Sequence, residues 1–238
     1  MKILLVARTL LFYIGYVVII TLFSVLTCTI GLLLSLKLRQ SLATCGNLLA
    51  DYWLRISCGI RVRVIGKGNI PPAPYVVLSN HQSPWETYYL QRHLRPVSTI
   101  LKKELLNIPF FGWALAAVKP IAIDRGNPRK SIKEVMDQGQ ARLAAGMNVI
   151  VYPEGTRMAY GQYGDYARSG TALAIAAGVP ILPVAHNGGR HWPAKKFLKY
   201  PGEITIIFGE PIETSGGNSK TLTQQAQDWI TAKQKDIL

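Results

Sequence analysis

The sequence predicts an α/β fold: a single domain with a central mixed sheet flanked by helices, preceded by an N-terminal hydrophobic membrane helix or helical hairpin. Three observations predict it. Short apolar runs typical of buried strands alternate with helix-length segments along residues 59–238. Polar residues directly follow several of these runs, as they do at the strand ends of α/β sheets. The N-terminal segment, residues 1–58, begins with a long stretch that carries no charge.

That charge-free stretch covers residues 9–36, whereas a helix needs only about 20 apolar residues to cross a bilayer. A cleavable signal peptide fits poorly, because its apolar region is normally about 7 to 15 residues long. Positive charge flanks both ends, with Lys2 and Arg8 before the stretch and Lys37 and Arg39 after it. Two alternatives follow: one long spanning helix, or two shorter helices that enter the membrane and return. We expect this segment to anchor the chain in the inner (cytoplasmic) membrane, with the domain on its cytoplasmic face.

The elements of the domain follow from local patterns. Apolar alternation at 60–65 predicts a first strand after an amphipathic helical stretch at 40–57. Ser83 followed by Pro84 is typical of a helix start, and Gly178 of a helix end. The other expected elements are strands at 75–79, 119–125, 148–152, 181–185 and 203–208, and helices at 128–145, 169–177 and 220–238.

The amino-acid composition limits the classes of ligand and partner that the chain is expected to bind. The 238 residues carry a formal charge of +14, from 27 Lys and Arg against 13 Asp and Glu, which favours anionic ligands such as lipid headgroups or phosphorylated substrates. We expect no nucleic-acid partner, because the basic residues are scattered and no nucleic-acid-binding motif is visible. Cys28, Cys45 and Cys58 are odd in number and lack metal-ligand spacing, so neither a disulfide framework nor a metal site is expected.

His81 and Glu86 are the first candidate catalytic residues. They lie five positions apart at a predicted strand-to-helix junction, as a general base and the carboxylate that orients it would. Glu86 also completes a capping box with Ser83, a purely structural role, and His81 could simply be satisfied by backbone groups at the turn. The two roles of Glu86 can coexist, with one carboxylate oxygen for the backbone and one for the imidazole.

Two further strand exits carry polar residues: Asp124 with Arg125, and Glu154 with Arg157. Convergence of these exits with His81 at one sheet edge is the simplest explanation. A guanidinium group suits a phosphate because it makes paired, charge-assisted hydrogen bonds. An isolated arginine is more often an ordinary solvated side chain, but two in the same context weaken that alternative.

Several sequence blocks together resemble the glycerolipid acyltransferases, in particular the 1-acyl-sn-glycerol-3-phosphate acyltransferase (lysophosphatidic acid acyltransferase) family. The resemblance covers roughly residues 60–212. Glu86 occupies a position where this family usually has Asp, and Tyr152 one where it often has Phe. The blocks lie at residues 80–86, 101–113, 123–125, 152–157 and 179–183.

The resemblance implies a membrane-bound enzyme that moves a fatty acyl group from acyl-CoA or acyl-carrier protein to the free sn-2 hydroxyl of 1-acyl-sn-glycerol 3-phosphate. The product would be phosphatidic acid, in phospholipid biosynthesis. The donor would be a co-substrate, with no resident cofactor. The implied catalytic residues are His81 and Glu86, and the implied substrate-binding residues are Arg125, Glu154, Gly155, Thr156 and Arg157.

The sequence is also compatible with other functions. The acceptor could be another lysophospholipid or a lyso-aminolipid, or the chain could be a non-catalytic, membrane-anchored lipid-binding protein. An esterase is disfavoured because no G-x-S-x-G motif is present. The block 179–183 could line an acyl or donor pocket or could be a buried strand. His93, His186 and His191 have no acidic partner nearby in the sequence, so we expect them to be non-catalytic.

Overall fold

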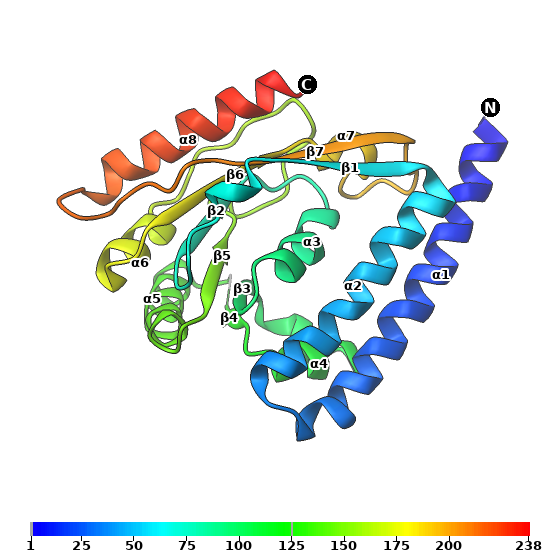
Figure 1. The fold of residues 1–238 in the computed structure, drawn as a ribbon, viewed down its shortest axis with the longest axis horizontal. Helices are drawn as coiled ribbons and strands as arrows, with labels where there is room; N and C mark the ends of the chain where they lie inside the picture. The colour runs from blue at the N-terminus through cyan, green and yellow to red at the C-terminus, as the bar shows by residue number, and fades with distance from the viewer. Residues whose placement is uncertain (1, 125) are drawn as a thin grey trace.

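The computed structural model describes residues 2–124 and 126–238. Within them, a seven-stranded sheet has the strand order β1-β7-β6-β2-β5-β3-β4 (Figure 1). Strands β6, β2, β5, β3 and β4 are mutually parallel, β7 is antiparallel to β6, and β1 is parallel to β7. The predicted mixed sheet is confirmed. The strands are β1 (Ile60–Ile65), β2 (Val76–Ser79), β3 (Val97–Lys102), β4 (Ile121–Ile123), β5 (Asn148–Val151), β6 (Ile181–His186) and β7 (Gly202–Phe208).

Helices cover both faces of the sheet. Helices α5, α6 and α8 lie on one face, and α3 lies on the other, with the α1–α2 pair beyond it (Figure 1). Buried apolar side chains form one cluster on each side, around Trp85 and Leu182 on the α3 side and around Leu173 and Ile181 on the other. The helices are α1 (Lys2–Cys28), α2 (Leu36–Cys58), α3 (Trp85–His93), α4 (Phe111–Ala117), α5 (Pro128–Ala144), α6 (Ser169–Ala177), α7 (Gly188–His191) and α8 (Ser219–Asp236).

The N-terminal segment forms a helical hairpin, as the predicted fold class allowed, but the hairpin is not made of two short helices within residues 9–36. Helix α1 is continuous, so the charge-free stretch does not fold back on itself; the second helix, α2, begins at its end. The helices are tied by the Arg8 Nε–H, which donates to the Ser57 carbonyl (2.8 Å), and by the Trp53 indole, which donates to the Phe12 carbonyl (3.0 Å). Gly59 (φ 70°) ends α2, in a conformation that favours glycine.

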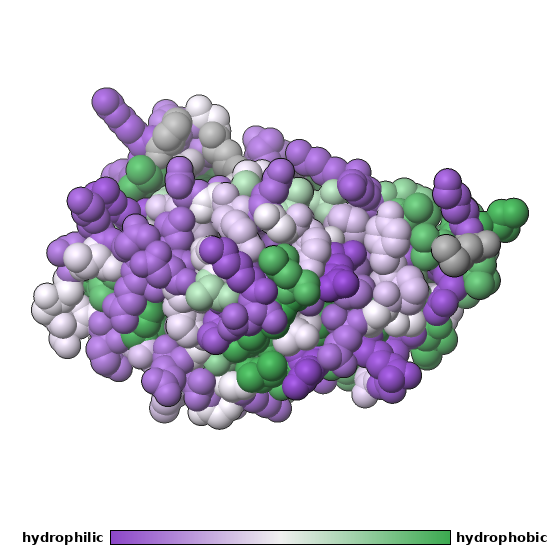
Figure 2. Space-filling view, turned by 90° about the horizontal axis from the view of Figure 1, so that it is seen from above, coloured by the Kyte–Doolittle hydropathy of each residue, from purple (hydrophilic) through white to green (hydrophobic). Residues whose placement is uncertain are grey.

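Helix α1 and the turn after it are long and apolar enough, by length and composition, to cross a membrane. Most of this apolar surface is not covered by protein, since only 11% of the apolar window is buried. Figure 2 shows hydrophobic surface at the end of the molecule where α1 begins, on the right, while much of the rest of that face is hydrophilic. Ile3 (87% exposed) and Leu33 (88% exposed) mark the two ends of this surface on the hairpin.

Three strands and α-helices had not been expected from the sequence: β3, whose residues VSTILK mix polar and apolar side chains, and the short helices α4 and α7. The strand expected at 119–125 is shorter, Ile121–Ile123. Lys119 adopts φ 63°, which lies outside the extended region, so the strand does not reach it. The remaining expected strands and helices of the domain are present, with ends that differ by at most a few residues.

Candidate active site

His81 is placed by the turn that leaves β2. The preceding residue, Asn80, extends the pairing of β2 with β6: its Nδ2 donates to the His186 carbonyl and its Oδ1 accepts from the His186 N–H, both at 2.9 Å. The Ser83 hydroxyl accepts from the Trp85 N–H (3.1 Å) at the start of α3. The turn is therefore held at both ends, and His81 between them is only 7% exposed.

Glu86 binds both the imidazole and the backbone of this turn. Its Oε1 accepts from His81 Nδ1 (2.8 Å), from the Gln82 N–H (3.1 Å) and from the Ser83 N–H (2.9 Å). The capping and orienting roles thus coexist, but on one oxygen; the expectation that each would use its own oxygen is wrong. Because an ionised carboxylate only accepts, the bonding pattern assigns the imidazole proton to Nδ1 and leaves the Nε2 lone pair for a substrate.

Glu86 is completely buried. Burial by itself raises the pKa of its carboxyl, but the nearby imidazoles of His186 and His81 and the donors on Oε1 more than offset this and hold the pKa below its ordinary value. The carboxylate is therefore ionised at neutral pH and can stabilise a positive charge on His81.

The turn after β5 packs against His81 from the other side. Tyr152 stacks on the imidazole, with ring centroids 4.2 Å apart and planes inclined by 20°. Glu154 Oε2 accepts from the His81 N–H (2.6 Å), and the Met158 N–H donates to the His81 carbonyl (2.8 Å). Gly155 (φ 68°) makes the intervening turn. Both backbone groups of His81 are thus bonded by the segment that follows β5.

Burial raises the pKa of Glu154 to about 8, although the hydrogen bond from His81 opposes that rise. The sequence had grouped Glu154 with the substrate-binding residues. In the structure its carboxylate oxygen meets the backbone of His81, which is a positioning contact.

The other expected substrate-binding residues that the structure describes are more exposed to solvent than Glu154. Thr156 and Arg157 are exposed, as is Gly155 at the turn. Arg157 Nε donates to the Ser83 carbonyl at 3.3 Å, so this side chain does come close to the His81 turn. Arg125 lies outside the described residues. The expected convergence therefore brings together His81, Glu86, Glu154 and Arg157.

A cavity of about 490 Å³ adjoins this cluster. His81, Tyr152 and Arg157 line it, and the rest of its wall comes from α1, α2, α3, β3 and α4. Apolar side chains such as Phe23, Leu101 and Leu115 make up much of the wall. The sequence had not predicted this contribution of the hairpin, because its signal was read only as membrane anchoring.

Helix α2 also ties the hairpin to the start of α3, next to the His81 turn. Asp51 Oδ1 accepts from the Trp85 indole (3.0 Å), one residue before Glu86. The block 179–183, by contrast, is a buried strand start: Ile181 pairs with Val76 at the beginning of β2, whereas His81 follows the end of β2. It does not line the cavity, so the buried-strand alternative holds.

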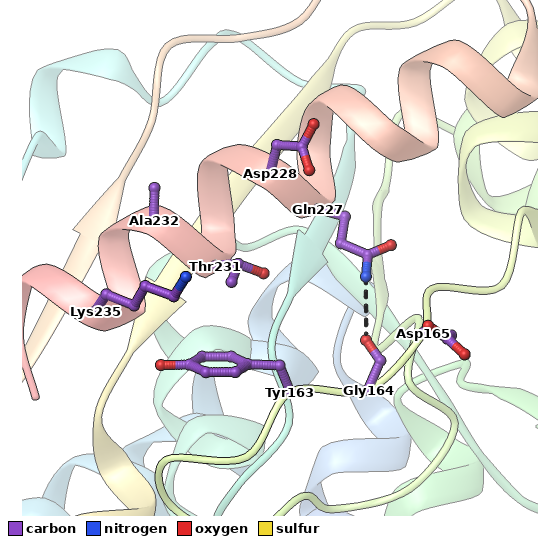
Figure 3. A pocket seen from close by; sticks show the side chains of 8 residues that line it. All are labelled: Tyr163, Gly164, Asp165, Gln227, Asp228, Thr231, Ala232 and Lys235. Atoms are coloured by element: carbon purple, nitrogen blue, oxygen red, sulfur yellow. Dashed lines mark hydrogen bonds between the residues drawn. The ribbon is translucent and has the colours of Figure 1, made fainter.

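A second hollow of about 460 Å³ lies between α8 and residues 163–165 (Figure 3). Tyr163 and Lys235 flank it, and Gln227 Nε2 donates to the Gly164 carbonyl (3.3 Å). It contains none of the expected site residues. In the part of the chain that the structure describes, no group of three or more His, Cys, Asp or Glu side chains could hold a metal ion.

The chain is similar to known acyltransferases. The sequence profile of the acyltransferase family matches residues 61–187. A 1-acyl-sn-glycerol-3-phosphate acyltransferase of Pseudomonas aeruginosa is 47% identical over 189 residues, which are 78% of this chain and 74% of that protein. The alpha form of Mus musculus is 34% identical over 66% of this chain and 57% of its own length.

Among solved structures, the 1-acyl-sn-glycerophosphate acyltransferase PlsC of Thermotoga maritima has the same fold. Its TM-score is 0.83 at 23% sequence identity, covering 99% of this chain and 97% of that one. The family profile over more than half of the residues and the bacterial relative at 47% identity lead to one conclusion: this chain belongs to the acyltransferase family.

Proposed function

We propose that the protein is a membrane-bound 1-acyl-sn-glycerol-3-phosphate acyltransferase, which moves a fatty acyl group from acyl-CoA or acyl-carrier protein to the sn-2 hydroxyl and yields phosphatidic acid. One observation carries the proposal: an imidazole with Nδ1 bonded to a buried carboxylate borders a largely apolar cavity, with an arginine beside it. The names of the relatives support the choice of acceptor.

His81 is the proposed general base. Its Nε2 takes the proton of the sn-2 hydroxyl as that oxygen attacks the thioester carbonyl. The tetrahedral intermediate then collapses, the C–S bond breaks, and the leaving thiolate takes the proton from the imidazolium. Glu86 holds the Nδ1–H tautomer and stabilises the imidazolium. The donor is a co-substrate, and no resident cofactor enters the proposed reaction.

The cavity is the proposed site of an acyl chain. Each methylene transferred from water to an apolar site contributes about 0.8 kcal/mol, so an apolar wall favours a long chain. Since His81 lines the same cavity, a chain bound there would hold its carboxyl end near the base.

Arg157, Arg125 and Thr156 are the proposed phosphate-binding residues, and Gly155 forms the turn that carries Thr156 and Arg157. Arg157 lies close enough to the His81 turn to bond the Ser83 carbonyl. A phosphate monoester on the acceptor would pair with these guanidinium groups while the sn-2 hydroxyl meets His81. Glu154 contributes by holding the backbone of His81.

The hairpin of residues 1–58 is the proposed membrane anchor and residues 59–238 the catalytic domain. The exposed apolar surface of α1 supports immersion in lipid, and the formal charge of +14 favours an anionic membrane surface. We propose that the protein lies at the inner membrane with its catalytic domain on the cytoplasmic face, because basic residues flank both ends of the apolar stretch.

The test is acyl transfer by the full chain purified in detergent, with a long-chain acyl-CoA and a panel of lysolipids, read as free thiol release and as lipid product. We expect release that depends on 1-acyl-sn-glycerol 3-phosphate. Transfer to a different lysolipid alone would replace the proposed acceptor. No transfer with any acceptor, from acyl-CoA or from acyl-carrier protein, would contradict the proposed function.

A further inference from the structure

His186 is the last residue of β6 and lies beneath the catalytic turn. Its side chain has no exposed surface. The side-chain amide of Asn80 bonds the main-chain N–H and carbonyl of His186 and so continues the β2–β6 pairing, which puts His186 beside His81 although the two are far apart in the sequence. The Trp85 ring lies edge-on to its imidazole, with centroids 6.0 Å apart and an interplanar angle of 67°.

The hydrogen bonds of His186 define its tautomer. Nδ1 accepts from the Gly188 N–H (3.1 Å), so the ring proton is on Nε2. Nε2 then donates to the Asn80 carbonyl (2.8 Å). The imidazole is neutral, because a second ring proton on Nδ1 would meet the Gly188 N–H.

The Glu86 carboxylate lies near the Nε2–H donor of His186 and is the group that this donor stabilises in our interpretation. Oε1 receives three hydrogen bonds, but Oε2 is buried and has no hydrogen-bond partner. His186 Nε2 lies 3.9 Å from Oε2. That distance is too long for a hydrogen bond, but in a buried site it is short enough for the partial positive charge of the Nε2–H group to stabilise the ionised oxygen.

We propose that His186 is a positioning residue for the catalytic pair: its neutral Nε2–H holds the Asn80 carbonyl and faces the second oxygen of Glu86, and so stabilises the carboxylate that orients His81. The inference rests on the proposed function, which it deepens. It also gives a role to a histidine that the sequence alone assigned to no acid.

Removing the donor should change how His81 titrates. Without it, the carboxylate in the buried pair is less stabilised, so the pair takes up a proton at a higher pH. The other titratable groups that face the pair are Tyr152, Glu154 and Arg157 from the segment after β5 and Tyr88 from α3, and the variants leave them unchanged.

The experiment compares His186→Leu with His186→Gln, whose side-chain amide can place a donor near the position of Nε2. We expect the Leu variant to lose about tenfold in kcat with little change in the acceptor KM, and the acidic limb of its pH profile to move up by roughly 0.5 to 1 unit. The Gln variant should recover both. His191→Leu is the matched control, because His191 is also a buried imidazole bonded to a carbonyl, that of Tyr200 (3.0 Å).

A second readout does not require activity. The chain has four histidines, so ¹⁵N-labelled imidazole resonances can be assigned by substitution and the pKa of His81 measured in each variant. Equal losses in the Leu and Gln variants without a shifted titration would show a merely structural role and overturn the proposal, as would a wild-type profile in the Leu variant. If wild-type protein acylates no lysolipid, the proposed function fails, while the His81 titration still decides the role of His186.

Discussion

The turns after β2 and β5 lie side by side at one edge of the sheet, yet their polar side chains are held very differently. After β2, His81 and Glu86 are 7% and 0% exposed and are joined by a 2.8 Å hydrogen bond. After β5, Thr156 and Arg157 are exposed, and the bond of Arg157 to Ser83 is long, at 3.3 Å. Proton transfer needs a fixed geometry, whereas an exposed arginine can adapt to a phosphate. The difference supports the proposed roles, with proton transfer at the first turn and phosphate recognition at the second.

The largest difference between the two turns should be seen when His81 is replaced. Replacing His81 with Ala removes the proposed base, so kcat should fall by about 100- to 10,000-fold, while the folded structure is kept because the main-chain bonds of the turn remain. Thiol release under saturating substrates measures the loss, and thermal unfolding checks the fold. Turnover within a few-fold of wild type in a folded His81→Ala protein would rule out His81 as the base.

Replacing Arg157 tests whether the turn after β5 binds the acceptor phosphate. Its replacement by Ala should raise the acceptor KM by about 10- to 100-fold, the effect of losing a charge-assisted bond to phosphate, with a smaller change in kcat. Arg168→Ala is the control, since Arg168 is also exposed but does not line the cavity. An acceptor KM equal to wild type would remove Arg157 from the phosphate site.

Chain-length preference tests the cavity between the hairpin and the sheet. Ala114 on α4 lines it and is 8% exposed, so Ala114→Leu should reduce the space and lower activity with long acyl donors relative to short ones several-fold. Ala116→Leu, on the exposed side of the same helix, should leave the preference unchanged. A preference that moves equally in both variants would mean that the chain binds elsewhere.

The smallest effect concerns Glu154, which joins the two turns. Burial raises its pKa from 4.5 to about 8, so the folded state holds a proton that the unfolded state releases. This carboxyl therefore costs stability progressively as pH rises from about 4.5 to 8. Glu154→Gln keeps an acceptor for the His81 N–H and removes the titration.

The difference in melting temperature between Glu154→Gln and wild type should therefore grow in favour of the variant from pH 5 to pH 8. Circular dichroism melts at the two pH values measure it. A difference that stays constant, or shrinks, across this range would show that Glu154 is ionised throughout.

Local pattern alone predicted much of the fold. The helix Ser169–Ala177 and the strand Ile60–Ile65 have the bounds expected from the sequence, since periodicity and a terminal glycine act over a few residues. The pairing of His81 with Glu86 was predictable for the same reason: they are five positions apart across one turn. The mixed strand β3 carried too weak a pattern to be predicted.

What the sequence by itself determined is therefore most of the local elements and the close pairing of His81 with Glu86 at the junction of β2 and α3. Only the tertiary structure decided that Glu154 bonds the His81 backbone, 73 residues away in sequence, and that His186 faces Glu86. It also decided that the hairpin, α3, α4 and β3 enclose one cavity. These contacts depend on which strands become neighbours in the sheet, and strand order is set by the packing of the whole chain rather than by any short stretch of it.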